Sequence, residues 1–348
     1  ASSRFSALIT TIKELEKITE ANGLDVEFAI NHNDDIYIFQ IRPIAVSRNW
    51  NRSICKEVDN SISQIKLYLE ENFRPQKNIL GQTTIFGEMP DWNPAEMIGS
   101  APRQLARSLY EFLITDSTWA RARAEMGYLD MTNHSLMKSL AGRVYIDVRN
   151  SFNSFIPSGL NFKTGEKIIN YWLEKLSNNP LLHDKVEFDV AITAFTFGTE
   201  KRLNEYKDFL SQEELEEYKS AVFNHTNQLI RKYDQNLIDY KKKLENLEIK
   251  RKKVNSFDHH DLNVIKSLLN SCRNNGTKTF SCMARYGFIA ESFLRSITEE
   301  NIWSKDRVEE FRSSIETVLT SFLKELNSTS KDITLKENFM EKYGHLRP

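Results

Sequence analysis

The spacing of apolar residues separates a short N-terminal region containing two strands from a longer region dominated by helices. Apolar side chains recur every three to four residues over 5–21, which predicts an amphipathic helix. Residues 24–30 and 36–42 instead alternate between apolar and polar side chains, as strands with one buried face do. The segment between them, 31–35, consists of Asn, His and Asp, and Asn and Asp favour turns. We therefore expect the two strands to pair as an antiparallel hairpin.

The middle of the chain carries shorter and less regular patterns. They predict three helices and two strands, namely helices at 59–73, 103–114 and 117–126 and strands at Gly142–Val148 and Val186–Phe195. The segment Thr83–Gly99 is irregular, but within it Asn93-Pro94-Ala95-Glu96 has the composition of a helix start. Asn favours the N-cap, Pro the first helical position and Glu the third, so a short helix is expected after Asn93.

From Ser211 onward the pattern is helical throughout. Ser211–Val254 contains neither Gly nor Pro, and its apolar residues recur every three to four positions. These features predict one helix of ~60 Å at 1.5 Å per residue, with the basic runs 241–243 and 250–253 on a solvated face. Three more helices are predicted at 259–274, 279–299 and 304–327. The expected fold class is α+β, mainly α: a hairpin followed by a helical bundle with a long helical arm.

Composition narrows the class of protein. A chain of 348 residues exceeds the ~250–300 residues at which single cores stop growing, so two or three packing units are expected. Lys and Arg number 47 against 48 Asp and Glu, and nucleic-acid binding needs a basic excess, so no nucleic-acid partner is expected. No apolar run reaches the ~18 residues of a membrane span. Three cysteines are too few for a disulfide framework, which favours a cytoplasmic protein.

The hairpin carries the polar residues with the most informative spacing. Asp25 and Glu27 are two positions apart, as are Gln40 and Arg42, so each pair projects from one face of its strand. If the faces coincide, two carboxylates, an amide and a guanidinium meet on one patch. Such a set suits Mg²⁺ and nucleotide phosphates. The alternative is a solvated face with a cross-strand Glu–Arg pair, and the spacing leaves both interpretations open.

The stretch LDVEFAINHNDDIYIFQIRPIAVSR, residues 24–48, resembles the end of the ATP-grasp domain in phosphoenolpyruvate synthase and pyruvate phosphate dikinase. In that family a D-x-E-[FW] strand is followed, a dozen or so residues later, by L-Q-x-R-P. The resemblance implies that Asp25, Glu27, Gln40 and Arg42 bind ATP, with Asp25 and Glu27 as the Mg²⁺ ligands.

Further segments resemble phosphoenolpyruvate-synthase-like proteins, namely Gly87–Gly99, Tyr145–Phe155, Phe280–Ser296 and Glu341–Pro348. The resemblance implies that 1–47 closes an ATP-grasp domain and that 48–348 is a central helical domain preceding a phosphohistidine domain. Within it, 48–200 would be mixed with short strands and 211–348 a helical bundle. In such an enzyme ATP phosphorylates a histidine, which passes the phosphoryl group to an acceptor such as pyruvate. The family also includes a rifampicin phosphotransferase, so the acceptor stays open.

Two parts of such an enzyme are missing from this sequence. The nucleotide-clamping half of the ATP-grasp domain does not precede the hairpin, and none of the seven histidines lies in a G-G-x-x-[ST]-H setting. The chain is therefore expected to be a fragment of a phosphotransferase that is inactive alone, with the missing parts as its partners. The alternative is a non-catalytic helical scaffold.

Five residues of the helical region are candidates for substrate contacts. Asp91 and Trp92 lie on an irregular segment, Arg149 and Asn153 follow a predicted strand, and Arg285 lies in an apolar helical stretch. Each has a structural alternative: a plug of the core for Trp92, helix capping around Asn153, and a buried ion pair for Arg285. His259-His260-Asp261 is interpreted as a helix start, because adjacent helical residues point ~100° apart and rarely share one metal ion.

Overall fold

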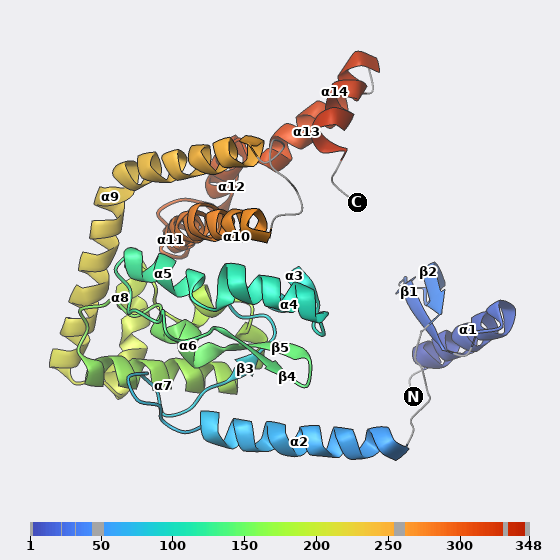
Figure 1. The fold of residues 1–348 in the computed structure, drawn as a ribbon, viewed down its shortest axis with the longest axis horizontal. Coiled ribbons are helices and arrows are strands. Elements are labelled where there is room, and N and C mark those ends of the chain that lie inside the picture. Colours follow the sequence, from blue (N-terminus) through green and yellow to red (C-terminus); the bar gives the residue numbers. More distant parts are fainter. Residues whose placement is uncertain are drawn as a thin grey trace. The chain divides into compact units, whose positions relative to one another are not determined.

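The computed structural model describes residues 3–21, 23–31, 33–43, 52–253, 262–329 and 333–344 (Figure 1). The chain divides into two compact units, 1–63 and 64–348. The described part is mainly helical and contains two small antiparallel sheets, which confirms the predicted fold class. Within it, no helix is long and apolar enough to cross a membrane.

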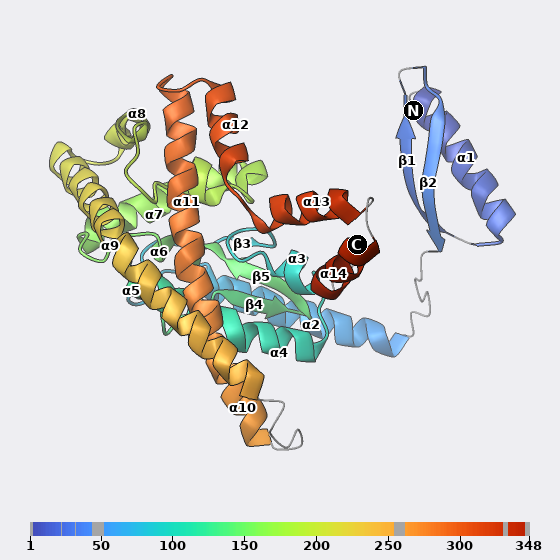
Figure 2. The same cartoon turned by 90° about the horizontal axis from the view of Figure 1, so that it is seen from above.

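The first unit is built around the predicted hairpin. Helix α1 (Ser3–Thr19) packs on strand β1 (Leu24–Ile30), which pairs antiparallel with β2 (Ile36–Pro43) (Figure 2). The Asn31 side chain fixes the turn, because its Oδ1 accepts hydrogen bonds from the backbone N–H groups of Asn33 and Asp35, both at 2.9 Å. The hairpin prediction is therefore confirmed. Helix α2 (Arg52–Asn72) then runs across the division between the two units.

In the second unit three strands and a series of helical segments follow. The strands are β3 (Phe86–Gly87), β4 (Met137–Leu140) and β5 (Arg143–Asp147). The helical segments up to residue 208 are α3 (Pro94–Ile98), α4 (Gln104–Tyr110), η1 (Glu111–Thr115), α5 (Thr118–Glu125), α6 (Val148–Asn153), α7 (Phe162–Asn178), η2 (Pro180–Leu182), η3 (Val186–Val190), α8 (Thr199–Arg202) and η4 (Leu203–Asp208). Those that follow are α9 (Gln212–Lys253), α10 (Leu262–Ser271), η6 (Cys272–Thr277), α11 (Lys278–Glu299), α12 (Lys305–Ser314), α13 (Val318–Thr329) and α14 (Ile333–Tyr343).

The three-stranded sheet has the order β3-β5-β4, with β5 in the centre. This confirms the strand predicted at Gly142–Val148. Ala141 and Gly142 join β4 to β5, and both have positive φ angles, of 48° and 82°. A two-residue turn with positive φ at both positions matches the right-handed twist of the strands it connects. Val144 and Ile146 on β5 are fully buried, so the sheet forms part of the core.

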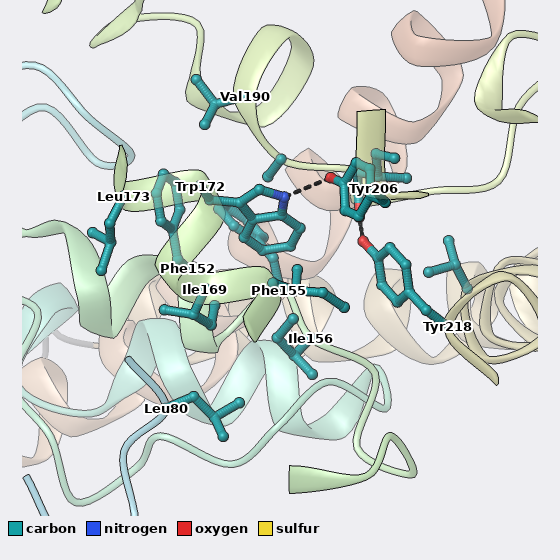
Figure 3. Close-up of a cluster of buried hydrophobic side chains, with 14 of the residues drawn as sticks. Leu80, Phe152, Phe155, Ile156, Ile169, Trp172, Leu173, Val190, Tyr206 and Tyr218 are labelled. Carbon is teal, nitrogen blue, oxygen red and sulfur yellow. Dashed lines mark hydrogen bonds between the residues drawn. The ribbon is translucent and has the colours of Figure 1, made fainter. Parts of the chain in front are cut away.

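The largest buried cluster lies around helix α7 (Figure 3). Trp172 is fully buried, its ring meets Phe152 edge-on at 5.5 Å, and its Nε1–H donates to the Tyr206 hydroxyl at 2.7 Å. Tyr218 stacks on Tyr206 at 5.6 Å between ring centroids. The cluster thus joins α6 and α7 to the start of α9 through aromatic contacts and a satisfied indole N–H.

Helix α9 confirms the long helix predicted from Ser211. Ser211 and Glu214 form a capping box: the Ser211 Oγ accepts from the Glu214 N–H at 3.2 Å, and the Glu214 carboxylate accepts from the Ser211 N–H at 2.8 Å. Leu215 near its start belongs to the cluster around α7, whereas Tyr240 belongs to a separate cluster with α5 and α11. Beyond Tyr240 the described side chains are exposed or half-buried, as predicted, and Lys243 pairs with Glu125 on α5 at 3.3 Å.

Two predicted elements are wrong. Val186–Phe195 is not a strand: a π-helical turn, η3, covers Val186–Val190, and its apolar residues enter the cluster around α7. A short apolar run does not distinguish a strand from other buried backbone. The helix predicted at 304–327 is divided into α12 and α13, because Thr317 accepts from the Thr320 N–H and starts a new helix.

The helices predicted at 259–274 and 279–299 are confirmed within the described residues as α10 and α11, and the π-helical turn η6 links them. Gly276 lies within this turn, where a side chain would approach Leu247 of α9 to 3.2 Å. The absence of a side chain at Gly276 therefore permits close packing of this turn against α9. His259-His260-Asp261 lies outside the described residues.

Candidate functional site

The polar residues of the hairpin meet on one face, as predicted. Asp25 is the cross-strand partner of Arg42, and Glu27 is that of Gln40, so all four side chains project to the same side. The guanidinium of Arg42 donates to the Gln40 Oε1 at 2.8 Å and to the Glu27 Oε1 at 3.1 Å. A register shift follows Glu27, so the alternation that aligns these residues ends there.

This face is open to solvent. The side chains of Arg42 and Glu27 are 58% and 57% exposed. An exposed ion pair of this kind contributes only ~0–1 kcal/mol to stability, so the hairpin does not depend on it. The guanidinium can exchange Glu27 and Gln40 for the oxygens of a ligand at little cost to the fold.

The carboxylates fit a role as magnesium ligands. Mg²⁺ in nucleotide sites is typically held by one or two carboxylates, while waters and phosphate oxygens complete its octahedral shell. Asp25 and Glu27 supply that number from one exposed face. Over the described ranges no group of three or more His, Cys, Asp or Glu side chains could hold a metal ion.

A second group of polar residues is buried in the 64–348 unit. We define the charge cluster as Asp91, Arg123, Glu187 and Arg285. Arg123 makes a bidentate contact with Asp91, with N–O distances of 2.6 and 2.8 Å, and its Nη2 lies 3.7 Å from Glu187. Arg285 donates to the other Glu187 oxygen at 3.2 Å. The four groups therefore form a chain of alternating charge whose net charge is zero.

Aromatic and hydroxyl groups complete this cluster. Both guanidinium groups lie over the ring of Phe155, at 4.4 Å for Arg123 and 5.2 Å for Arg285. Arg285 also donates to the Tyr128 hydroxyl at 3.1 Å and to the Thr193 Oγ1 at 2.5 Å. Burial raises the pKa of the Glu187 carboxyl, an effect that the neighbouring Arg285 opposes.

A cavity of about 210 Å³ opens beside the charge cluster. It is lined by the four charged residues, by Ser281, and by an apolar and aromatic wall, namely Trp92, Phe280, Ala284 and Phe288. Three of the substrate candidates chosen from the sequence, Asp91, Trp92 and Arg285, therefore share one cavity. The Trp92 and Phe280 rings lie 6.0 Å apart between centroids.

Arg149 and Asn153, the other two candidates, hold backbone groups instead. Arg149 is fully buried, and its guanidinium donates to the carbonyls of Asn72 and Arg74, both at 2.9 Å. The Asn153 amide accepts from the Leu80 N–H and donates to the Leu80 carbonyl, both at 2.9 Å. Neither lines the cavity beside the charge cluster, and both side chains anchor the segment that follows α2.

Several polar residues in and near these candidates have the structural roles, helix capping and ion pairing, that were the alternatives to ligand binding. The Asn93 side chain caps α3 by accepting from the Glu96 N–H at 3.2 Å. Arg285 forms the buried ion pair described above, and Arg295 pairs with Glu291 at 3.2 Å. Helix capping and ion pairing therefore account for the polar atoms of these residues, and among them Arg285 also lines the cavity beside the charge cluster.

Sequence reasoning missed two members of the charge cluster, Arg123 and Glu187. Arg123 lies on α5, in which charged residues occupy every second position from Arg121 to Glu125. Their spacing does not indicate which of these side chains is buried. The sequence does contain a signal for Glu187. This residue interrupts an apolar run, and a charged side chain in such a run is expected to be buried with a partner.

Comparisons with protein-family models, with curated proteins and with solved structures found no match to this chain.

Proposed function

We propose that this chain is part of an ATP-dependent phosphotransferase of the phosphoenolpyruvate synthase kind, and that the hairpin face contacts the magnesium–nucleotide. The observation that carries the proposal is the exposed convergence of Asp25, Glu27, Gln40 and Arg42 on one face. The resemblance of residues 24–48 to the end of an ATP-grasp domain supports the same assignment. A phosphohistidine relay to an acceptor such as pyruvate would follow from that class, and ATP as donor fits a cytoplasmic location.

Each residue of the hairpin face would have a distinct task. The planar guanidinium of Arg42 suits bidentate contact with phosphate oxygens, and the Gln40 amide can orient the same group. Asp25 and Glu27 would hold Mg²⁺, which neutralises phosphate charge and polarises the phosphoryl group. In this assignment 1–47 belongs to the nucleotide-binding domain and 48–348 to a central helical domain.

Replacing Arg42 with Ala tests the nucleotide assignment in the full-length product of this gene. Loss of a charge-assisted contact to phosphate costs roughly 1.5–3 kcal/mol, which corresponds to about a 10- to 100-fold fall in kcat/KM for ATP. Magnesium-dependent ATP consumption is the measurement. Arg143→Ala is the matched control, because Arg143 forms a similarly exposed pair with Glu88 at 3.2 Å and lies outside the hairpin. Equal activity of Arg42→Ala and the unaltered protein would refute the assignment.

The 348-residue chain by itself is expected to remain unlabelled on incubation with ATP carrying radiolabel at the β or γ phosphate. None of its seven histidines has the small-residue surroundings of a carrier histidine. The measurement is acid-labile, base-stable label on the protein, with a phosphohistidine-forming enzyme as positive control. Stoichiometric label on any histidine of this chain would show that the carrier lies within it.

A further inference from the structure

The Glu187 carboxylate has hydrogen-bonding capacity that the described residues do not use. Its Oε2 accepts from Arg285 at 3.2 Å, whereas its Oε1 lies 3.7 Å from the nearest Arg123 nitrogen, beyond hydrogen-bond distance. The side chain is only 8% exposed. A buried carboxylate ordinarily accepts several hydrogen bonds, so Oε1 is an acceptor without a protein donor. Glu187 and Arg123, the residue nearest to Oε1, both line the cavity beside the charge cluster.

The walls of the cavity limit what can reach that acceptor. Trp92, Phe280 and Phe288 contribute aromatic surface, and Ala284 leaves room between them. A cavity of about 150 Å³ holds benzene, so 210 Å³ accommodates one substituted ring. Apolar walls stabilise the ring by removing it from water.

The charge balance of the site favours a neutral ligand. Asp91 occupies both Nη atoms of Arg123 at 2.6 and 2.8 Å, and Arg285 is engaged with Glu187, Tyr128 and Thr193. An anion would meet two carboxylates alongside two guanidinium groups that are already paired. A cation would likewise meet two guanidinium groups alongside two carboxylates that are already paired.

The number of unpaired polar groups in the cavity limits the number of hydroxyl groups that a ligand can carry. Besides Glu187 Oε1, the cavity offers the Ser281 hydroxyl among mostly apolar walls, so a third hydroxyl on the ligand would be buried without a partner. Each such unpaired hydroxyl costs roughly 1–3 kcal/mol, which disfavours sugars and other polyols. A ring with a single hydroxyl satisfies Oε1 and brings no further hydroxyl into the cavity.

We infer that this cavity binds a neutral, single-ring compound carrying one hydroxyl group, which donates its hydrogen bond to Glu187. The ring lies against Trp92, Phe280 and Phe288. This inference is independent of the nucleotide assignment, because every residue that carries it belongs to the 64–348 unit and none to the hairpin.

Phenol is the probe that tests the site on the whole chain. Calorimetric titration should give a dissociation constant on the order of 1 mM for phenol. Toluene has the same shape without a donor, benzoate adds a charge and glucose adds hydroxyls; each should bind at least about 10-fold more weakly. Equal binding of phenol and toluene, or tighter binding of benzoate or glucose, would overturn the inference.

Three substitutions locate the binding. Ala284→Leu places a side chain in the cavity and should abolish phenol binding, while Phe280→Ala should weaken it about 5-fold through loss of one wall. Phe162→Ala is the matched control for Phe280, because Phe162 is similarly exposed, at 54% against 60%, and lies on α7 outside the cavity. Thermal unfolding of each variant checks that the fold is retained. Undiminished phenol binding by Ala284→Leu would place the ligand elsewhere.

Glu187→Gln tests the acceptor itself. The amide keeps the volume but loses the negative charge, so the preference for phenol over toluene should fall to less than about 3-fold. If this variant does not fold, comparing phenol with toluene on the unaltered chain and on Ala284→Leu still decides the inference. A folded Glu187→Gln that keeps the full preference would refute the role of Glu187.

Discussion

Replacing Arg285 with Met is expected to lower the free energy of unfolding by about 3–5 kcal/mol, because it leaves a buried charge without its partner. Arg285 supplies the hydrogen bond that Glu187 Oε2 accepts, at 3.2 Å, and Glu187 is only 7% exposed. The same change also removes the donors to Tyr128 and Thr193. Urea unfolding followed by circular dichroism measures the loss.

Arg295→Met is the matched control for this substitution. Arg295 lies on the same helix, α11, but its side chain is 40% exposed and it pairs with Glu291 near the surface. Its loss should cost less than about 1 kcal/mol. The double variant Arg285→Met/Glu187→Gln should recover part of the loss, because it removes the uncompensated charge. A cost below 1 kcal/mol for Arg285→Met would mean that the charge cluster does not stabilise the fold.

Trp172→Ala is expected to lower the free energy of unfolding by about 3–5 kcal/mol, the range for removing a large aromatic side chain from a core. Trp172 is fully buried, meets Phe152 edge-on at 5.5 Å and donates to Tyr206 at 2.7 Å. The substitution leaves a cavity and removes the hydrogen bond that the Tyr206 hydroxyl accepts from the indole. Urea unfolding followed by circular dichroism measures this loss as well.

Leu181→Ala provides the comparison for Trp172. Leu181 follows α7 and is 86% exposed, so its truncation should change the unfolding free energy by no more than about 0.5 kcal/mol. Trp172→Phe should lie between the two, because it keeps most of the apolar contact and loses the indole donor. Similar costs for Trp172→Ala and Leu181→Ala would mean that the cluster around α7 is not the core of this unit.

The elements predicted well are those whose signal is local. The hairpin follows from strict alternation on both sides of a turn, and the Asn31 side chain makes that turn from within the same five residues. Helix α9 follows from 42 residues without a helix breaker and from the capping pair Ser211 and Glu214. In each case residues close in sequence supply the stabilising contacts.

The charge cluster could be predicted only in part, because its contacts join distant parts of the chain. Asp91 and Arg285 were selected singly, but their partners lie 32 and 98 residues away along the sequence. Periodicity identifies a buried face and does not say which charges meet on it. Arg149 shows the opposite error. An arginine suits an anionic ligand, but this one donates its hydrogen bonds to the carbonyls of Asn72 and Arg74.

Helix α9 has a consequence for how the 64–348 unit loses its structure. Leu215, Tyr218 and Val222 pack in the cluster around α7, whereas Leu229 and Tyr240 pack with α5 and α11. One ladder of backbone hydrogen bonds therefore spans two separate cores. Unfolding of either core removes apolar contacts from α9, and helices in proteins are stabilised mainly by such contacts. The two cores are therefore expected to open together, as one cooperative unit.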